Sequence, residues 1–221
     1  MCRLSHHGRT FTPFPSYDDL TIPIKVPGDW DDIPTAGINH KTSINMQMDV
    51  RRQKKALGGY YACVSYMDAQ VGKVMQALRD AGLEDETIVI FTSDHGYHLG
   101  EHDFWAKVSL RDESAGTAHH QRTGKQPAVC DSFVELLDLY PTISYLCGLD
   151  VPERLQGQDI SPMLDDPTHT VREARLSVAP RERAPPADND WAYIQYEEDA
   201  SAGIGCSTHT LDRSQFHNLA S

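Results

Sequence analysis

The chain has 221 residues, 39% of them hydrophobic, and a formal net charge of −12 at pH 7. This length allows one large domain or one and a half small ones, and the acidic balance argues against a nucleic-acid surface. The sequence has no apolar signal core at its N-terminus and no apolar run of about 18 residues, so no export signal and no membrane span are predicted. An odd set of cysteines without metal or redox spacing predicts no disulfide framework: Cys2, Cys63, Cys130, Cys147 and Cys206.

The first half of the chain predicts an irregular segment followed by a long helix. Several prolines within residues 1–45 prevent a long helix there. From 46 to about 80, apolar residues recur at steps of three and four and form a stripe expected to face the core. Gly58-Gly59 interrupts this pattern, which is typical of a break into two helices, and Gly82 fits its C-terminal end. The stripe consists of Tyr60, Tyr61, Val64, Met67, Val71, Val74, Met75 and Leu78.

A short apolar run and a polar turn come next and contain the candidate site. Residues 88–92, Ile-Val-Ile-Phe-Thr, predict a fully buried strand. Asp94 and His95 follow directly, where ligand sites form at the carboxyl ends of strands in open α/β sheets. A carboxylate beside an imidazole can form half of a metal site. Gly96 and Gly100 allow sharp turns that would bring the loop back over this site.

Other interpretations of these residues remain open. An isolated Asp-His pair after a strand is more often a turn with a surface imidazole, and an isolated Lys107 would by default be solvated. His95, His98 and His102 also have spacings that could suit zinc. No cysteine or fourth ligand is near them in the sequence, so the hard-oxygen setting favours calcium or magnesium.

Residues 93–102, Ser-Asp-His-Gly-Tyr-His-Leu-Gly-Glu-His, and Trp-Ala-Lys at 105–107 resemble the second metal-binding segment of the sulfatases, most closely the iduronate-2-sulfatase-like branch. The resemblance implies an α/β chain with a partial alkaline-phosphatase-like sulfatase fold, an incomplete mixed sheet flanked by helices. It implies hydrolysis of sulfate esters by a formylglycine made from a cysteine, with Ca²⁺ on the sulfate and Mg²⁺ as the alternative ion. By position, Asp94 and His95 would be metal ligands, and Lys107 would be catalytic, holding a sulfate or leaving-group oxygen.

The same resemblance implies a sulfated carbohydrate or another sulfate ester as substrate, and no nucleic-acid or membrane partner. Proteins of this family are often exported or lysosomal. The resemblance also divides the chain into an irregular segment at 1–45, the C-terminal part of a catalytic domain at 46–179, and a small strand and tail region at 180–221. Residues 12–16 resemble the loop after a catalytic histidine of the family, but Phe11 occupies that position and His6 and His7 are out of register.

Two parts of the family pattern are absent from these residues. No cysteine or serine begins the nucleophile signature, which is Cys or Ser, any residue, Pro or Ala, Ser and Arg. The aspartate pair of the first metal segment is also absent. The sequence therefore predicts a C-terminal sulfatase fragment with half of a metal site, which binds a cation weakly and is inactive alone. The alternatives are a pseudoenzyme or interaction module, and a phosphoesterase of the same superfold.

Residues 116–124 break the resemblance sharply. The family has an apolar strand of the type Val-Pro-Leu-Ile there, whereas this stretch has no apolar residue larger than alanine. Burying its imidazoles and guanidinium would be costly, so a solvated loop is expected. A coding frame shift would explain why the resemblance stops and resumes so abruptly. Codons for these residues, read from the second base, can give Val-Pro-Leu-Ile-Ile-Ser-Val-Pro. A divergent insertion is the alternative, and the coding DNA distinguishes the two.

The remaining chain predicts a helix and two strands. Asp138 is a candidate N-cap, Pro141 suits a first turn, and Gly148 suits the end of that helix. Ile143, Leu146 and Cys147 are expected to face the core. Strands are predicted at 174–178 and 191–196, a loop at 180–190, and a polar tail from 205.

Overall fold

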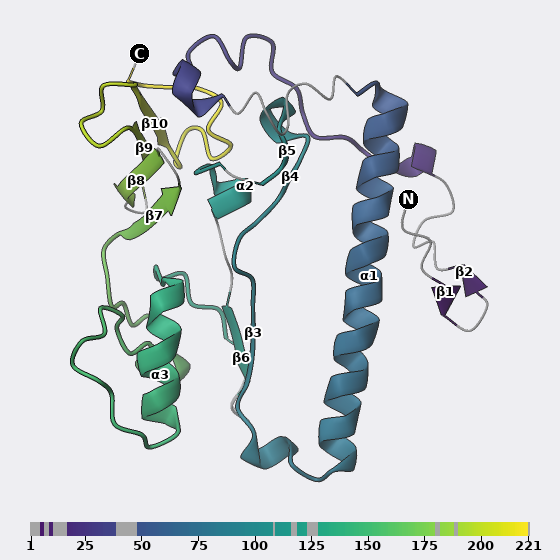
Figure 1. Cartoon of the computed structure of the whole chain (residues 1–221), viewed down its shortest axis with the longest axis vertical. Helices are drawn as coiled ribbons and strands as arrows, with labels where there is room; N and C mark the ends of the chain where they lie inside the picture. Colours follow the sequence, from purple (N-terminus) through teal and green to yellow (C-terminus); the bar gives the residue numbers. More distant parts are fainter. Residues whose placement is uncertain are drawn as a thin grey trace.

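The computed structural model describes residues 5–6, 9–10, 17–38, 48–107, 109–115, 119–122, 128–179, 182–187 and 190–220. Helices and strands alternate along these ranges, which confirms the predicted mixture of α and β structure. The helices are α1 (Val50–Asp80), α2 (Asp112–Ala115) and α3 (Leu139–Leu146). In Figure 1, α1 forms one flank of the chain, and β3 (Val89–Thr92) lies between α1 and α3. No helix in the described ranges is long and apolar enough to cross a membrane.

Within the described ranges, the strands form four small antiparallel sheets. The largest has the order β10-β9-β8-β7, with β7 (Arg175–Ala179), β8 (Glu182–Ala187), β9 (Trp191–Tyr196) and β10 (Ile204–Thr208). The three strand pairs are β1–β2 (Ser5–His6, Arg9–Thr10), β3–β6 (the latter His119–Arg122) and β4–β5 (His98–Leu99, Trp105–Ala106). Short 3-10 helices are η1 (Tyr17–Asp19), η2 (Thr35–Gly37), η4 (Glu84–Glu86), η5 (Glu101–Asp103), η6 (Leu136–Asp138) and η7 (Ser161–Leu164).

Helix α1 is continuous, so the predicted break at Gly58-Gly59 is wrong. Gly58 instead allows a close approach, because a Cβ there would lie 2.3 Å from the Tyr17 ring. The helix begins at an Asp49 cap, whose carboxylate accepts the Arg52 N–H at 2.8 Å. It ends at Asp80, and Gly82, with a φ of +67°, lies just beyond this end as predicted.

The core lies where the N-terminal part of α1 meets the β4–β5 pair. Leu20, Leu57 and Trp105 are its buried members. No residue of α1 after Gly58 is buried, so the apolar stripe does not face this core. The main contact of α1 with another described element is with η1, near its N-terminal end. Strand β3 is also less buried than predicted, because in the described ranges it pairs only with β6 and leaves Phe91 46% exposed.

The second half of the chain contains more strand than the sequence predicts. Residues 119–122 form β6 instead of a loop, and the rest of 116–124 lies outside the described residues, as does Phe11. Strands β8 and β10 occupy segments predicted as a loop and a polar tail, whereas β7 and β9 confirm the other two predicted strands. Pairing with neighbouring strands outweighs the weak strand propensity of these polar segments.

Helix α3 confirms its predicted limits but not its predicted buried face. Asp138 precedes it, and Gly148 follows it with a φ of +66°. The buried residues are Pro141, Thr142 and Ser144, whereas Ile143 is 39% exposed and Cys147 is exposed. The helix therefore presents its small and polar side to the chain, because that side hydrogen-bonds the segment that follows.

Candidate functional site

Asp94 and His95 lie in the turn that directly follows β3, where the sequence places them. Two hydrogen bonds hold this turn: the Ser93 Oγ donates to the His95 carbonyl at 2.6 Å, and the Gly96 N–H donates to the Ser114 carbonyl at 2.8 Å. The Asp94 side chain is 82% exposed and that of His95 is 35% exposed. The turn thus presents a solvated carboxylate beside a partly buried imidazole.

Lys107 reaches the same place through the β4–β5 pair. In the β4–β5 pair His98 lies opposite Ala106, so the chain leaves β5 beside the turn that contains His95. Gly100 has a φ of +118°, which supports the predicted sharp turn, and Ala106 also has a positive φ of 74°. As a result the Lys107 Nζ donates to the His95 Nε2 at 2.9 Å, although the two residues come from different elements.

The hydrogen bonds of His95 define which nitrogen carries its proton. Its Nδ1 lies 2.8 Å from the Gly96 carbonyl, an acceptor, so Nδ1–H is the donor. The Nε2 therefore carries the lone pair that accepts from Lys107, and it lies 3.6 Å from the Asp94 Oδ2. One carboxylate, one imidazole lone pair and one ammonium group converge, an arrangement able to bind both a cation and an anion.

The three histidines of the alternative zinc interpretation do not converge. His98 is buried and its Nε2 bonds the Ser109 Oγ at 2.9 Å. His102 is buried next to His98, with ring centres 6.4 Å apart, but its Nδ1 is taken by the Asp29 Oδ2 at 2.9 Å. In the described part of the chain, no group of three or more His, Cys, Asp or Glu side chains is arranged to hold a metal.

Asp94 and His95 can supply only part of a calcium site. Calcium takes six to eight oxygen-type ligands, whereas Asp94 and His95 supply two donor side chains. An exposed carboxylate and an imidazole lie side by side, and the imidazole Nε2 lone pair, which accepts from Lys107 in this structure, is the one that a cation would use. The described residues therefore fit two positions of a larger coordination sphere.

Buried polar groups lie beneath the loop that positions Lys107. Burial, with smaller effects from His102 and Arg111, lowers the pKa of His98 from 6.5 to about 3. Burial also raises the pKa of Glu113. The Arg111 Nη1 donates to the His102 Nε2 at 3.3 Å, so His102 is held between Asp29 and a guanidinium.

A pocket of about 610 Å³ opens beside the three convergent residues. Its polar lining includes Arg175 and Glu135, which no local sequence pattern identifies, because they join the site only through tertiary contacts. The Arg175 Nη2 donates to the Asp112 Oδ1, and its guanidinium lies 5.6 Å from the Phe133 ring centre. Its charge is therefore balanced by a carboxylate, whereas Lys107 contacts an imidazole.

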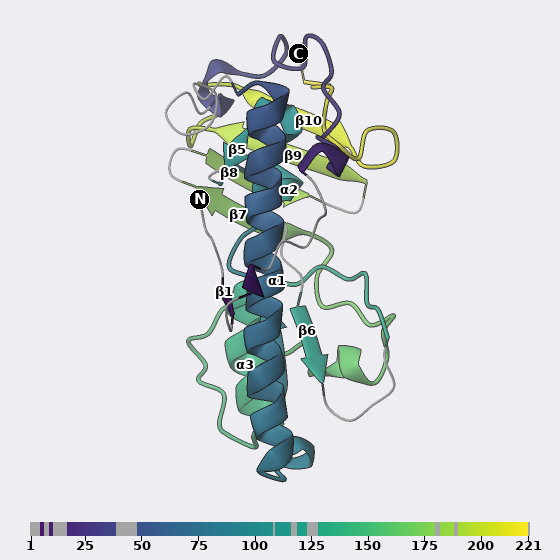
Figure 2. The same cartoon turned by 90° about the vertical axis from the view of Figure 1, so that its right-hand side faces the viewer.

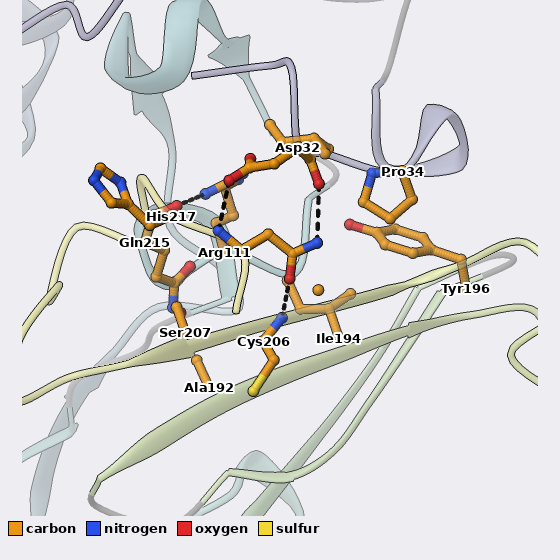
Figure 3. Close-up of a pocket in the computed structure, with 13 residues that line it drawn as sticks. Asp32, Pro34, Arg111, Ala192, Ile194, Tyr196, Cys206, Ser207, Gln215 and His217 are labelled. Carbon is orange, nitrogen blue, oxygen red and sulfur yellow. Dashed lines mark hydrogen bonds between the residues drawn. The ribbon is translucent and has the colours of Figure 1, made fainter. Parts of the chain in front are cut away.

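A second, smaller pocket lies away from these residues, between the 32–34 segment and the β9–β10 strands (Figure 3). Its volume is about 30 Å³, which holds no more than about two water molecules. It is lined by Asp32, Arg111, Tyr196 and Gln215, among others. A pocket of this size does not suit a substrate, so the larger one is the candidate site.

Comparison with known proteins places the chain in a family. The sulfatase family model matches residues 29–148. Iduronate 2-sulfatase of Mus musculus is 38% identical over 129 residues, which cover 46% of this chain and 23% of that protein. A sulfatase of Formosa agariphila is 30% identical over 178 residues, covering 77% of this chain and 35% of that protein. The chain thus spans about a quarter to a third of the length of these relatives.

Solved structures agree on the fold. A 2-O GAG sulfatase matches 99% of this chain and 50% of its own, with a TM-score of 0.70 and 20% identity. A phosphonate monoester hydrolase from Silicibacter pomeroyi matches 92% of this chain and 47% of its own, with a TM-score of 0.76 and 20% identity. The chain belongs to the sulfatase family and has part of its alkaline-phosphatase-like α/β fold.

Proposed function

We propose that this chain supplies the Asp94–His95–Lys107 part of a site that hydrolyses sulfate esters, in a branch similar to iduronate 2-sulfatase. The observation that carries the proposal is the 2.9 Å contact between the Lys107 Nζ and the His95 Nε2, with the Asp94 carboxylate beside it. Family membership supports the reaction class. The relatives named for iduronate 2-sulfate and 2-O GAG sulfate favour a sulfated carbohydrate as substrate.

The three residues have distinct roles in this proposal. Asp94 and His95 would hold a divalent cation, Ca²⁺ or Mg²⁺, which supplies Lewis-acid polarisation of sulfate oxygens when it is bound. Lys107 donates hydrogen bonds to an oxygen of the sulfate or of the leaving group and so stabilises its negative charge. The Gly96 carbonyl keeps the His95 proton on Nδ1, so the cation would take the Nε2 lone pair that accepts from Lys107 in this structure. Because these residues contain no nucleophile signature, the chain alone is expected to be inactive.

Metal binding by the purified chain tests the assignment of Asp94 and His95. Titration with CaCl₂ should shift the ring resonances of His95 with a dissociation constant on the order of a millimolar, because two donors make a weak calcium site. Asp94→Ala and His95→Ala should each weaken this binding at least about tenfold, whereas Asp150→Ala, at an exposed carboxylate of the 149–160 segment, should leave it unchanged. Equal calcium binding by the wild type and Asp94→Ala would contradict the assignment.

Phosphoester hydrolysis is a second candidate, favoured by the likeness to a phosphonate monoester hydrolase. The two substrates each carry one negative charge at neutral pH, so they differ in the atom that is attacked, sulfur or phosphorus, and not in the charge that Lys107 meets. Turnover of 4-nitrophenyl sulfate and of a phenyl phosphonate monoester, by the chain combined with a nucleophile-bearing segment, distinguishes them. A preference for the sulfate ester supports the first proposal, and a preference for the phosphonate supports the second.

A further inference from the structure

The β4–β5 hairpin that precedes Lys107 is not held by its own backbone alone. Each of its strands contributes two residues, and an isolated pair of such short strands is at best marginally stable. His102 and Asp103 in its loop have positive φ angles of 54° and 57°, and Ala106 in β5 has 74°. Residues other than glycine rarely adopt this left-handed region, so the conformation persists only where other parts of the chain hold it.

A segment that precedes α1 in the sequence holds this hairpin from outside. The Lys25 Nζ donates to the Gly100 carbonyl and lies 2.5 Å from the Asp103 Oδ1. The Trp30 Nε1 donates to the His102 carbonyl at 2.7 Å. In Figure 1 and in the perpendicular view of Figure 2, the purple segment before α1 passes over the end of the molecule at which β5 lies. Two of these contacts are therefore made at the strained residues themselves.

Asp29 adds a buried contact to those of Lys25 and Trp30, and these three residues together are named the clamp. The His102 Nδ1 donates to both oxygens of the Asp29 carboxylate, at 2.9 and 3.2 Å, and the two side chains are 0% and 7% exposed. From the other side, the Arg111 Nη1 donates to the His102 Nε2 at 3.3 Å. A buried hydrogen bond is costly to leave unmade, so the clamp fixes His102 in its left-handed conformation.

The orientation of this hairpin determines where Lys107 points. Lys107 follows Ala106 directly, and its Nζ donates to the His95 Nε2 at 2.9 Å. The same Nε2 lies 3.6 Å from the Asp94 Oδ2, and a cation held by these two side chains would take its lone pair. We propose that the clamp positions Lys107: through His102 it keeps the ammonium group beside the cation position, where an oxygen of a sulfate ester needs a donor. This inference rests on the proposed function, because that function gives Lys107 its role.

Substitutions in the clamp test this proposal on the purified chain. Asp29→Asn removes the buried carboxylate. Lys25→Met removes a cation whose side chain is 30% exposed, so this variant should fold even where the buried substitution does not. Asp31→Asn is the matched control, because it changes an exposed carboxylate of the same segment. The nuclear Overhauser effect between the Lys107 Hε and His95 Hε1 protons reports their contact, and titration with CaCl₂ reports how available the His95 Nε2 is.

Both clamp variants should lose the Lys107–His95 Overhauser effect, and Asp31→Asn should keep it. The displaced ammonium group no longer competes for the His95 Nε2, so Asp29→Asn should lower the Kd for calcium at least about threefold. A loosened site would instead raise this Kd, and so would the loss of the negative charge of Asp29. Lys107→Met should lower the Kd to the same extent, and adding Asp29→Asn to it should change the Kd no further.

An Overhauser effect that the clamp variants retain overturns the proposal, as does a calcium Kd that rises with Asp29→Asn. Equal effects of Asp29→Asn and Asp31→Asn, or no Overhauser effect in the wild type, overturn it as well. Failure of the proposed function gives a different result: the chain then binds no calcium at Asp94 and His95, while the Overhauser effect still decides whether the clamp positions Lys107.

Discussion

His98 is a buried imidazole whose charge is linked to folding. Its side chain is almost fully buried, it bonds the Ser109 Oγ, and its pKa falls from 6.5 to about 3 because burial disfavours the charged form. The unfolded chain binds a proton at this residue below pH 6.5, whereas the folded chain does so only near pH 3. The contribution of His98 to the free energy of unfolding is therefore fully present above pH 6.5, and it is lost progressively as the pH falls towards 3.

Substitution of His98 should flatten this pH dependence. Between pH 6.5 and 5, the wild-type free energy of unfolding should fall by about 1 kcal/mol per pH unit more than that of His98→Gln. Urea unfolding at several pH values measures the difference in slope, whatever the absolute stability of the variant. His217→Gln is the control, because the His217 side chain is 73% exposed, and it should keep the wild-type slope. Parallel slopes for wild type and His98→Gln would show that His98 titrates normally.

The residues of the candidate site that belong to one local sequence motif were predictable. Asp94, His95 and Lys107 lie within fourteen consecutive positions, and the structure brings them together. Asp29 and Arg175 could not be predicted, because they reach the region from positions far away in the chain. No periodicity or spacing links such residues; only the tertiary fold does.

At the scale of single elements, Asp138 joins the start of α3 to two later segments. Its side chain is fully buried and accepts the Glu135 N–H at 2.7 Å, the Gln158 N–H at 2.8 Å, and a hydrogen bond from Arg172. It therefore does more than precede the helix: a single carboxylate fixes the entry to α3, the 149–160 segment and the approach to β7. Removal of one partner of a buried ion pair leaves the other charge uncompensated.

Asp138→Asn should destabilise the chain by about 2–3 kcal/mol, since an amide group with one acceptor oxygen would face three hydrogen-bond donors, and Arg172 would keep only Glu135 as its charged partner. Chemical denaturation gives the loss of stability, and hydrogen exchange should speed up most at the Gln158 amide. Asp150→Asn tests the same chemistry at an exposed carboxylate and should change stability by less than about 0.5 kcal/mol. A cost below about 1 kcal/mol for Asp138→Asn would mean that Arg172 and Glu135 hold this junction without it.

Elements with a strong local pattern were predictable, and elements that depend on their neighbours were not. The periodicity of α1 and the alternation of β9 fix both from the sequence. Strand β8 contains Pro185 and Pro186 and becomes a strand because β7 and β9 flank it. The buried face of α3 was misassigned because Thr142 packs inward to accept the Ile160 N–H, a contact eighteen residues away.

At the scale of the whole molecule, Asn218 connects the C-terminal tail with a segment of the N-terminal half. Its Nδ2 donates to the Asp32 and Ile204 carbonyls at 2.9 and 3.0 Å. Its Oδ1 accepts the Cys206 and Ala220 N–H groups at 2.9 and 3.1 Å. One side chain thus holds the 29–38 segment, strand β10 and the tail together beside the small pocket of Figure 3.

Asn218→Asp should cost about 2–3 kcal/mol, because it keeps the two acceptor contacts but turns both donor contacts into repulsion between oxygens. Loss of stability in urea, together with faster proteolysis within residues 209–217, would be the signature. Ser214→Asp adds the same charge to an exposed position of the tail and should change neither. If both substitutions had equal effects, the added charge alone would account for the loss.

The whole fold was predictable from the sequence as a class, but the packing between its elements was not. The family resemblance gives the α/β fold, which the comparisons support. The exposed stripe of α1 follows from what lies against the helix, a property that its own periodicity cannot reveal. Strand β6 is similar: residues 119–122 are polar in sequence yet pair with β3. The frame-shift hypothesis for 116–124 stays a hypothesis that the coding DNA can decide.

Two of the three tryptophans lie beside the loop that carries Lys107. The Trp30 Nε1 donates to the His102 carbonyl at 2.7 Å, and Trp105 is buried two residues before the lysine. Trp191 is far more exposed, at 46%. Indole emission is sensitive to local polarity, and buried indoles emit at shorter wavelengths. The short-wavelength part of the intrinsic fluorescence of this protein therefore reports whether the loop before Lys107 stays packed, without any added dye.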